Sequence, residues 1–175
     1  MKKIFVFVIP LLVWSSCENK KQYFQTSREI DLAKKHLEDY QNRDWEGFQS
    51  LFADSALVNI NTWWGDEITG EELTKLFEEH SSALSEISIS ADSFYEMIVM
   101  DDGTKWVHCW ALWEGSFKNG NSAETVINFG WLFDSEKVNR MTIIYNSQPL
   151  IEASKTTESE VDTTSVLQMS DSLGS

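Results

Sequence analysis

From Glu86 onward, apolar residues recur at every second position of the chain. Ile87, Ile89 and Ala91 alternate with polar residues, and the pattern continues to about Met100. A period of two is typical of a β-strand, because successive side chains of an extended chain point to opposite faces. This region is therefore expected to form strands.

Three turn signals divide the chain beyond this region. An Asp-Gly pair lies within residues 101–103, an Asn-Gly pair within 118–121, and a weaker signal at 134–137. The Asn-Gly pair suits the positive φ angles of a two-residue hairpin turn. Four consecutive strands joined by short turns predict an antiparallel meander.

Helical spacing precedes the strands. Thr26-Ser-Arg-Glu29 is a capping box and opens a helix that ends near Asn42, and Asp44 can cap a second, shorter helix. Residues 56–61 form a short strand candidate, and Thr69-Gly-Glu-Glu72 is a second capping box that opens a third helix. Three helices followed by one long antiparallel sheet predict an α+β domain with the helices on one face of the sheet.

The composition favours one acidic domain. The chain has 175 residues, of which 42% are hydrophobic, which is enough for one compact core. Its 28 acidic residues against 14 basic ones give a net charge of −14, which repels phosphate backbones. Nucleic acid is therefore not expected as a partner.

The first residues are typical of an export signal. Lys2 and Lys3 precede an apolar run from Ile4 to Trp14, too short to span a membrane as a helix, and small residues come directly before Cys17. The segment resembles a bacterial lipoprotein signal, although Trp14 stands where such signals usually carry an aliphatic residue. The resemblance implies lipid on Cys17 and a membrane anchor in the cell envelope. The alternative is an ordinary secretory signal with an incidental cysteine.

These features divide the chain into four segments. Residues 1–16 are the expected signal peptide, and 17–25 are the lipidated cysteine and a polar tether. The folded domain is expected over 26–150. Residues 151–175 are rich in Ser, Thr and Glu and lack aromatic residues, so they are expected to be disordered. If Cys17 carries lipid, Cys109 has no partner for a disulfide.

One run resembles a known superfamily. The residues from Asp39 to Ala56, DYQNRDWEGFQSLFADSA, with Gly70 at the start of the third helix, resemble the nuclear transport factor 2-like superfamily and its SnoaL-like branch. The resemblance implies a cone of three helices packed on the concave face of a curved sheet, with a pocket between them. That superfamily contains ketosteroid isomerases, polyketide cyclases and dehydratases, and also noncatalytic binding and dimerisation domains.

The acids of the catalytic relatives are missing at the matching positions. The carboxylate base of ketosteroid isomerase-like members falls within Val58–Asn61, and a second acid falls at Asn128 or Phe129, none of which ionises near neutral pH. Their tyrosine donor corresponds to His36. The resemblance therefore favours a noncatalytic small-molecule-binding or dimerisation module. The alternative is a SnoaL-like isomerase, cyclase or dehydratase in which His36 or His80 transfers protons.

The two histidines also have structural interpretations. His80 follows the apolar stripe of the third helix and can point into the pocket or be a neutral core residue. His36 lies at the edge of the apolar face of its helix. Neither has a neighbour at the spacing of a catalytic triad, and the sequence has no metal-binding spacing, so no metal or cofactor is expected.

Aromatic residues dominate the expected pocket for a small apolar ligand. Trp63 and Trp64 follow the first expected strand, where they can stack on a ligand or close the open end of the cone over the core. The predicted pocket set is His36, Tyr40, Trp63, Trp64, His80, Trp113, Phe129, Trp131, Met141 and Tyr145.

The segment KWVHCWALWEG, residues 105–115, places a histidine beside a cysteine. In an extended strand, His108 and Cys109 point to opposite faces and cannot share a metal. Matching to the superfamily places Cys109, Ala111 and Trp113 toward the helices. The other row is too apolar to be left in water, so it predicts a homodimer interface on the outer face of the sheet. That row consists of Trp106, His108, Trp110 and Leu112.

Overall fold

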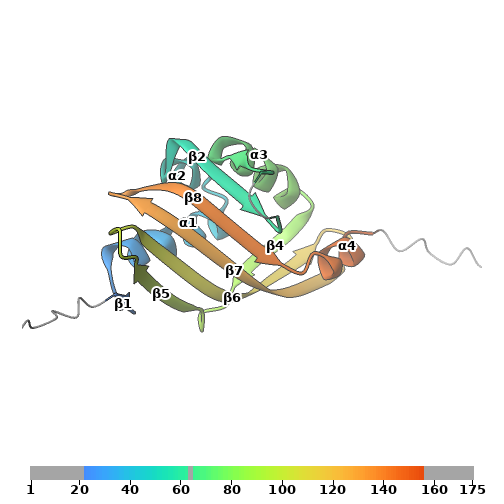
Figure 1. Ribbon diagram of the computed structural model, residues 1–175. Coiled ribbons are helices and arrows are strands. Elements are labelled where there is room, and N and C mark those ends of the chain that lie inside the picture. Colours follow the sequence, from blue (N-terminus) through green and yellow to red (C-terminus); the bar gives the residue numbers. More distant parts are fainter. Residues whose placement is uncertain (1–21, 63–64, 156–175) are drawn as a thin grey trace, which may run out of the picture.

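The computed structural model describes residues 22–62 and 65–155 (Figure 1). The expected signal peptide, Cys17 and most of its tether, Trp63 and Trp64, and the chain from residue 156 lie outside the described residues. In the part described, no helix is long and apolar enough to cross a membrane.

The centre of the fold is one curved sheet whose strands run in the order β1-β5-β6-β7-β8-β2-β3, with β4 also paired to β6. Neighbouring strands are antiparallel except β2 and β8, which are parallel. The strands are β1 (Tyr23–Phe24), β2 (Phe52–Ile60), β3 (Ile68–Thr69), β4 (Leu84–Ile89), β5 (Phe94–Val99), β6 (Lys105–Phe117), β7 (Ser122–Asp134) and β8 (Lys137–Tyr145).

The alternating region before residue 100 forms two strands, not one continuous strand. A turn in which the Ser93 amide donates to the Ser90 carbonyl, 3.2 Å away, separates β4 from β5. Both strands pair with the same edge of β6, β4 with its second half and β5 with its first. The 13-residue length of β6 makes room for both partners.

Three helices cover the inner face of the sheet, as Figure 1 shows. They are α1 (Arg28–Asn42), α2 (Trp45–Ser50) and α3 (Gly70–Ser81). The cap of α1 is Ser27, one residue after the expected Thr26, and its hydroxyl accepts from the Ile30 amide at 3.1 Å. Asp44 caps α2 as expected. The α+β class and the placement of the helices on the sheet are confirmed.

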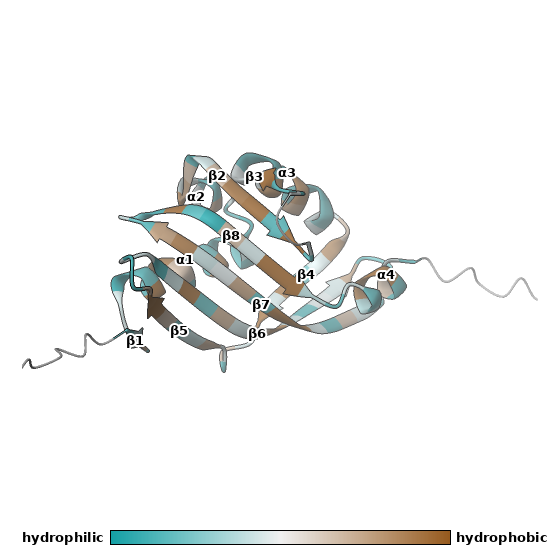
Figure 2. Cartoon of the chain, viewed as in Figure 1, coloured by the Kyte–Doolittle hydropathy of each residue, from teal (hydrophilic) through white to brown (hydrophobic). Residues whose placement is uncertain are grey.

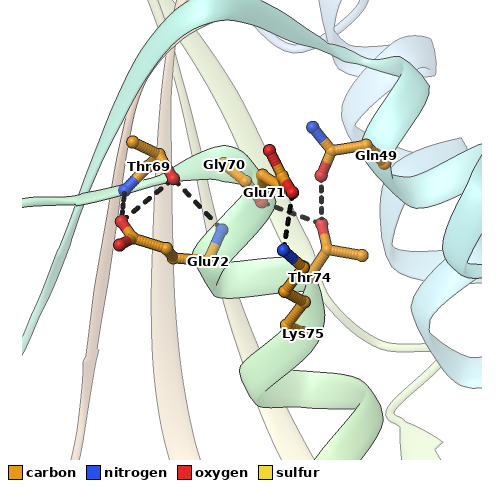
Figure 3. Close-up of polar contacts among 7 residues, drawn as sticks. All are labelled: Gln49, Thr69, Gly70, Glu71, Glu72, Thr74 and Lys75. Atoms are coloured by element: carbon orange, nitrogen blue, oxygen red, sulfur yellow. Dashed lines mark hydrogen bonds and ion pairs between the residues drawn. The ribbon is translucent and has the colours of Figure 1, made fainter.

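The start of α3 also anchors α2 (Figure 3). The Thr69 hydroxyl accepts from the Glu72 amide at 3.1 Å, and a Glu72 carboxylate oxygen accepts from the Thr69 amide at 2.8 Å, which is the expected capping box. One turn later, the buried Thr74 hydroxyl donates to Gln49 of α2. A Cβ at Gly70 would lie 2.6 Å from Cγ of Phe52, so glycine permits this close approach of α3 to β2.

A fourth helix follows the last strand. α4 (Gln148–Ser154) begins with Pro149 in its first turn, and Ala153 belongs to the buried core. Ordered structure therefore continues past residue 150, where the sequence predicted the domain to end. At the other end, Tyr23 and Phe24 of the expected tether pair with β5.

The sheet has one apolar face and one mixed face. Hydrophilic and hydrophobic bands alternate along β6 and β7 in Figure 2, as expected for strands with one buried face. Cys109, Ala111 and Trp113 are buried under the helices, whereas Trp110 is 52% exposed on the other side. The predicted facing of the two rows of β6 agrees with this structure.

Candidate functional site

A cavity of about 530 Å³ lies between the ends of α1 and α3, the inner face of β6–β8, and α4. Its walls are mainly apolar, and rings come from two helices and three strands. Drug-sized ligand sites in proteins have volumes in this range. The aromatic residues that line it are Tyr40, Phe77, Trp113, Phe117, Phe129 and Tyr145.

The predicted pocket residues fall into three groups. Tyr40, His80, Trp113, Phe129 and Tyr145 line the cavity. A second group, His36, Trp131 and Met141, is fully buried and does not line this cavity. Trp63 and Trp64, the third group, lie outside the described residues.

A tryptophan and a tyrosine join the sheet to α1 at the cavity wall. The Trp113 indole N–H donates to the Tyr40 hydroxyl, and the two atoms are 3.0 Å apart. Because this bond uses Tyr40 as an acceptor, the phenol proton stays available to a ligand. Trp113 lies across Gly115 of the same strand, where a Cβ would be 2.2 Å from Cη2 of the indole.

Both cavity phenols are hydrogen-bond donors near neutral pH. Burial raises the pKa of Tyr40 to about 12, and burial also raises the pKa of Tyr145. An unionised phenol can donate to a ligand oxygen, but it is not a general base at pH 7.

His36 is part of the core. Its Nε2 lies 3.1 Å from the Phe48 carbonyl oxygen of α2, and its Nδ1 accepts from the Trp131 indole N–H of β7 at 3.1 Å. The ring also stacks on Phe48, with centroids 3.9 Å apart. These partners fix the neutral tautomer protonated on Nε2, and burial lowers the pKa of His36 to about 3. No nitrogen is left for proton transfer to a ligand.

His80 has the opposite environment. It lies in the last turn of α3, exposed at the mouth of the cavity and next to Glu79, which also lines the mouth. Within the described ranges, no hydrogen bond joins its ring to a carboxylate. The helical pattern predicted a pocket or core position for His80 and an edge position for His36. In the structure, His36 is the neutral core residue and His80 is the exposed one.

Several residues that line the cavity are not in the predicted pocket set. Phe117 and Thr125 continue the inward rows of β6 and β7, so the period-two pattern could have identified them. Leu150 and Ile151 come from α4, whose one sequence signal is the proline at its start. Among the described residues, no group of three or more His, Cys, Asp or Glu side chains is arranged to hold a metal ion.

No protein-family model matches the chain, and no curated protein sequence matches it. Solved structures do match. AclR from Streptomyces galilaeus, described provisionally as a hydroxylase, has a TM-score of 0.59 at 13% identity over 72% of this chain and 94% of its own. A nuclear transport factor 2-like protein from Burkholderia xenovorans has a TM-score of 0.53 at 16% identity, over 75% of this chain and 100% of its own. A protein from Shewanella denitrificans, described provisionally as a SnoaL-like polyketide cyclase, has a TM-score of 0.56 at 9% identity, over 71% of this chain and 95% of its own.

These likenesses confirm the predicted nuclear transport factor 2-like fold. Identities this low show the fold alone, because one fold supports many different activities.

We predict that His36 makes stability fall in mild acid. Below pH 6.5 the unfolded chain binds a proton on His36 that the native state, with a pKa of about 3, does not bind. The free energy of unfolding is therefore not lowered by this group above pH 6.5, and it falls by about 1.4 kcal/mol per pH unit as the pH drops from 6.5 toward 3. Urea unfolding at pH 7.0, 5.5 and 4.5 measures this decline.

Two matched variants isolate this contribution from the many carboxylates of the chain. His36→Gln should be less stable than wild type at pH 7 but should show a shallower decline with acid. His80→Gln changes an exposed ring and should leave the decline as it is in wild type. An equal decline in all three proteins would contradict the assignment to His36.

Proposed function

We propose that this chain is a SnoaL-like domain that binds a small, mainly apolar molecule without transforming it. The observation that carries the proposal is the aromatic cavity between the helices and the inner face of the sheet, with Tyr40 in its wall, whose phenol proton is not used by the bond from Trp113. A ligand with a carbonyl or hydroxyl oxygen on a ring system would bury its apolar surface against the rings. Its oxygen would accept from Tyr40.

The charges at the cavity narrow the ligand class to neutral or cationic molecules. Glu79 is the one lining residue with a formal charge among the described residues, and neither lysine nor arginine lines the cavity. A buried carboxylate on a ligand would find no cation to offset its desolvation. The net charge of −14 further disfavours the approach of anions.

The absence of a base at the buried end supports the noncatalytic proposal over an enzyme. The titratable residues among the described cavity residues are Tyr40, Tyr145, Glu79 and His80. The two phenols have raised pKa values, and Glu79 and His80 lie exposed at the mouth. An isomerase, cyclase or dehydratase would have to use His80 from there.

We expect a neutral fluorescent probe to bind in this cavity. 1-Aminoanthracene should gain fluorescence with the purified protein, whereas anthracene-1-carboxylate of the same size should bind at least about tenfold more weakly, because its charge is desolvated without a partner. Ile127→Phe fills the cavity from β7 and should weaken probe binding at least about tenfold.

Val126→Phe is the matched control, because it adds the same ring one residue away on the exposed face of β7, where Val126 is 63% exposed. It should leave the affinity unchanged. Equal affinities for wild type and Ile127→Phe would exclude the cavity as the probe site, and tighter binding of the carboxylate would refute the charge argument.

We also propose that the protein is exported and anchored to the cell envelope by lipid on Cys17. The supporting observation is the signal-like sequence of residues 1–16, which precedes a cysteine. Cells fed an alkyne-labelled fatty acid should incorporate label into the protein, and Cys17→Ser should abolish labelling while Cys109→Ser retains it. Unlabelled wild-type protein in a lipoprotein-producing bacterium would refute the anchor.

We propose in addition that the outer face of the sheet pairs with a second copy of the chain. Trp110, Val126 and Ile144 are 52%, 63% and 59% exposed on neighbouring strands of that face, so an apolar surface is available for burial. The predicted contact row is Trp106, His108, Trp110 and Leu112.

Sedimentation of the unlipidated Cys17→Ser protein should therefore give the mass of a dimer. Trp110→Glu should convert it to a monomer, because a charge would be buried at the contact. Ile151→Glu changes a residue of similar exposure, 48%, on α4 and should remain dimeric. A monomeric Cys17→Ser protein at micromolar concentration would rule out this interface.

A further inference from the structure

We propose that α4 is a hinged wall of the cavity and that Asn119 and Asn121 are positioning residues that hold it closed. The inference rests on the proposed ligand site and adds how that site is entered. Both asparagines lie in the β6–β7 hairpin, outside the cavity, and they hold the end of α4 by backbone carbonyl oxygens that any sequence of α4 would offer.

α4 forms one side of the cavity. Leu150, Ile151 and Ser154 line it, and Ala153 is buried against the sheet. Figure 1 shows α4 apart from α1–α3, at the end of the sheet and next to the β6–β7 hairpin. The remaining walls belong to the sheet and to α1 and α3, which carry the main core. α4 contributes only Ala153 to the buried core, so it is the wall whose movement exposes least of that core.

α4 has little stability of its own. It has seven residues, fewer than an isolated helix needs, and Ser147 at its start makes no capping hydrogen bond through its side chain. Ile151 is half exposed, so part of its apolar surface gains nothing from the closed position. Elements with few buried contacts are those that open locally at low free-energy cost.

A pair of side-chain amides fastens the far end of the helix. Asn119 Nδ2 donates to the carbonyl oxygens of Ala153 and Lys155, at 2.9 and 3.2 Å. Asn121 Nδ2 donates to the same two oxygens, at 3.0 and 3.2 Å. We call these two side chains the asparagine latch. They satisfy carbonyls that the end of a helix leaves without intrahelical partners.

The hairpin presents both amides in one direction. The Asn121 backbone N–H donates to Asn119 Oδ1 at 2.9 Å, which orients the first amide, and Gly120 between them adopts a φ of +91°. Phe117, at the start of this hairpin, lines the cavity. The latch therefore connects a cavity wall on the sheet with the movable wall on α4.

The latch is tested through access to a position beneath α4. Thr125→Cys, in a Cys17→Ser background, places a thiol in the cavity lining, and Cys109 is fully buried. Asn119→Asp keeps the acceptor for Asn121 but loses the donors, and Asn121→Ala removes the second amide. The double latch variant should raise the rate of N-ethylmaleimide labelling at position 125 about tenfold, because the closed state loses four hydrogen bonds.

A variant of the other long hairpin is the matched control. Asn139→Ala removes an amide that bonds Asp134 and has no bond to α4. With this variant, N-ethylmaleimide should label position 125 at the same rate as in the protein that keeps Asn119 and Asn121. If the latch variants label at that same rate too, α4 is a fixed wall and the proposal fails, whether or not any ligand binds.

Probe kinetics separate gating from a merely structural role. In stopped-flow measurements with 1-aminoanthracene, loss of the latch should raise the association and dissociation rates together, each by about three- to tenfold, with a smaller change in the dissociation constant. A change in dissociation alone would indicate lost ligand contacts and would contradict gating. If wild type fails to bind the probe while labelling still responds to the latch, the ligand proposal fails and the movable wall stands.

Discussion

A neutral imidazole joins two helices of this domain to its sheet. His36 of α1 donates to a backbone carbonyl of α2 and accepts from an indole of β7, so two helices and the sheet share one ring. Both bonds require the same tautomer. Protonation would place a hydrogen on Nδ1, the nitrogen that faces the Trp131 indole N–H, and two donors would then face each other. The orientation of α1 on the sheet depends on this ring. The position of Tyr40, one turn further along α1 and bonded to Trp113, depends on it in turn.

Much of the fold could be predicted from local pattern. Alternation and hairpin turns identified β6, β7 and β8, and the capping box at Thr69 located the start of α3. The break between β4 and β5 was missed because alternation continues across it, and only the length of the partner β6 reveals it. α4 was missed because seven residues give too short a window for helical periodicity.

The site was harder to predict, because its chemistry depends on distant partners. His36 lies three residues after the buried Ala33 and four before Tyr40, yet a polar residue is not counted as core unless its partners are known. Those partners lie 12 and 95 positions away in the chain. His80 follows the apolar stripe of α3, but the helix ends one residue later, beyond the cover of the sheet. Periodicity gives the direction of a side chain and not the extent of the layer beneath it.

The parallel pairing of β2 with β8 determines when the fold can be completed. Val58 lies beside Met141, so a strand from the first third of the domain finds its neighbour only in the last strand of the sheet. Until residues 137–145 are available, β2 has β3 alone as a partner, and a two-residue strand contributes little. Contacts of such long sequence separation slow folding. During synthesis, the pairing of β2 with β8 therefore cannot form until residues 137–145 have been made, whereas the pairs among β5, β6 and β7 do not wait for it.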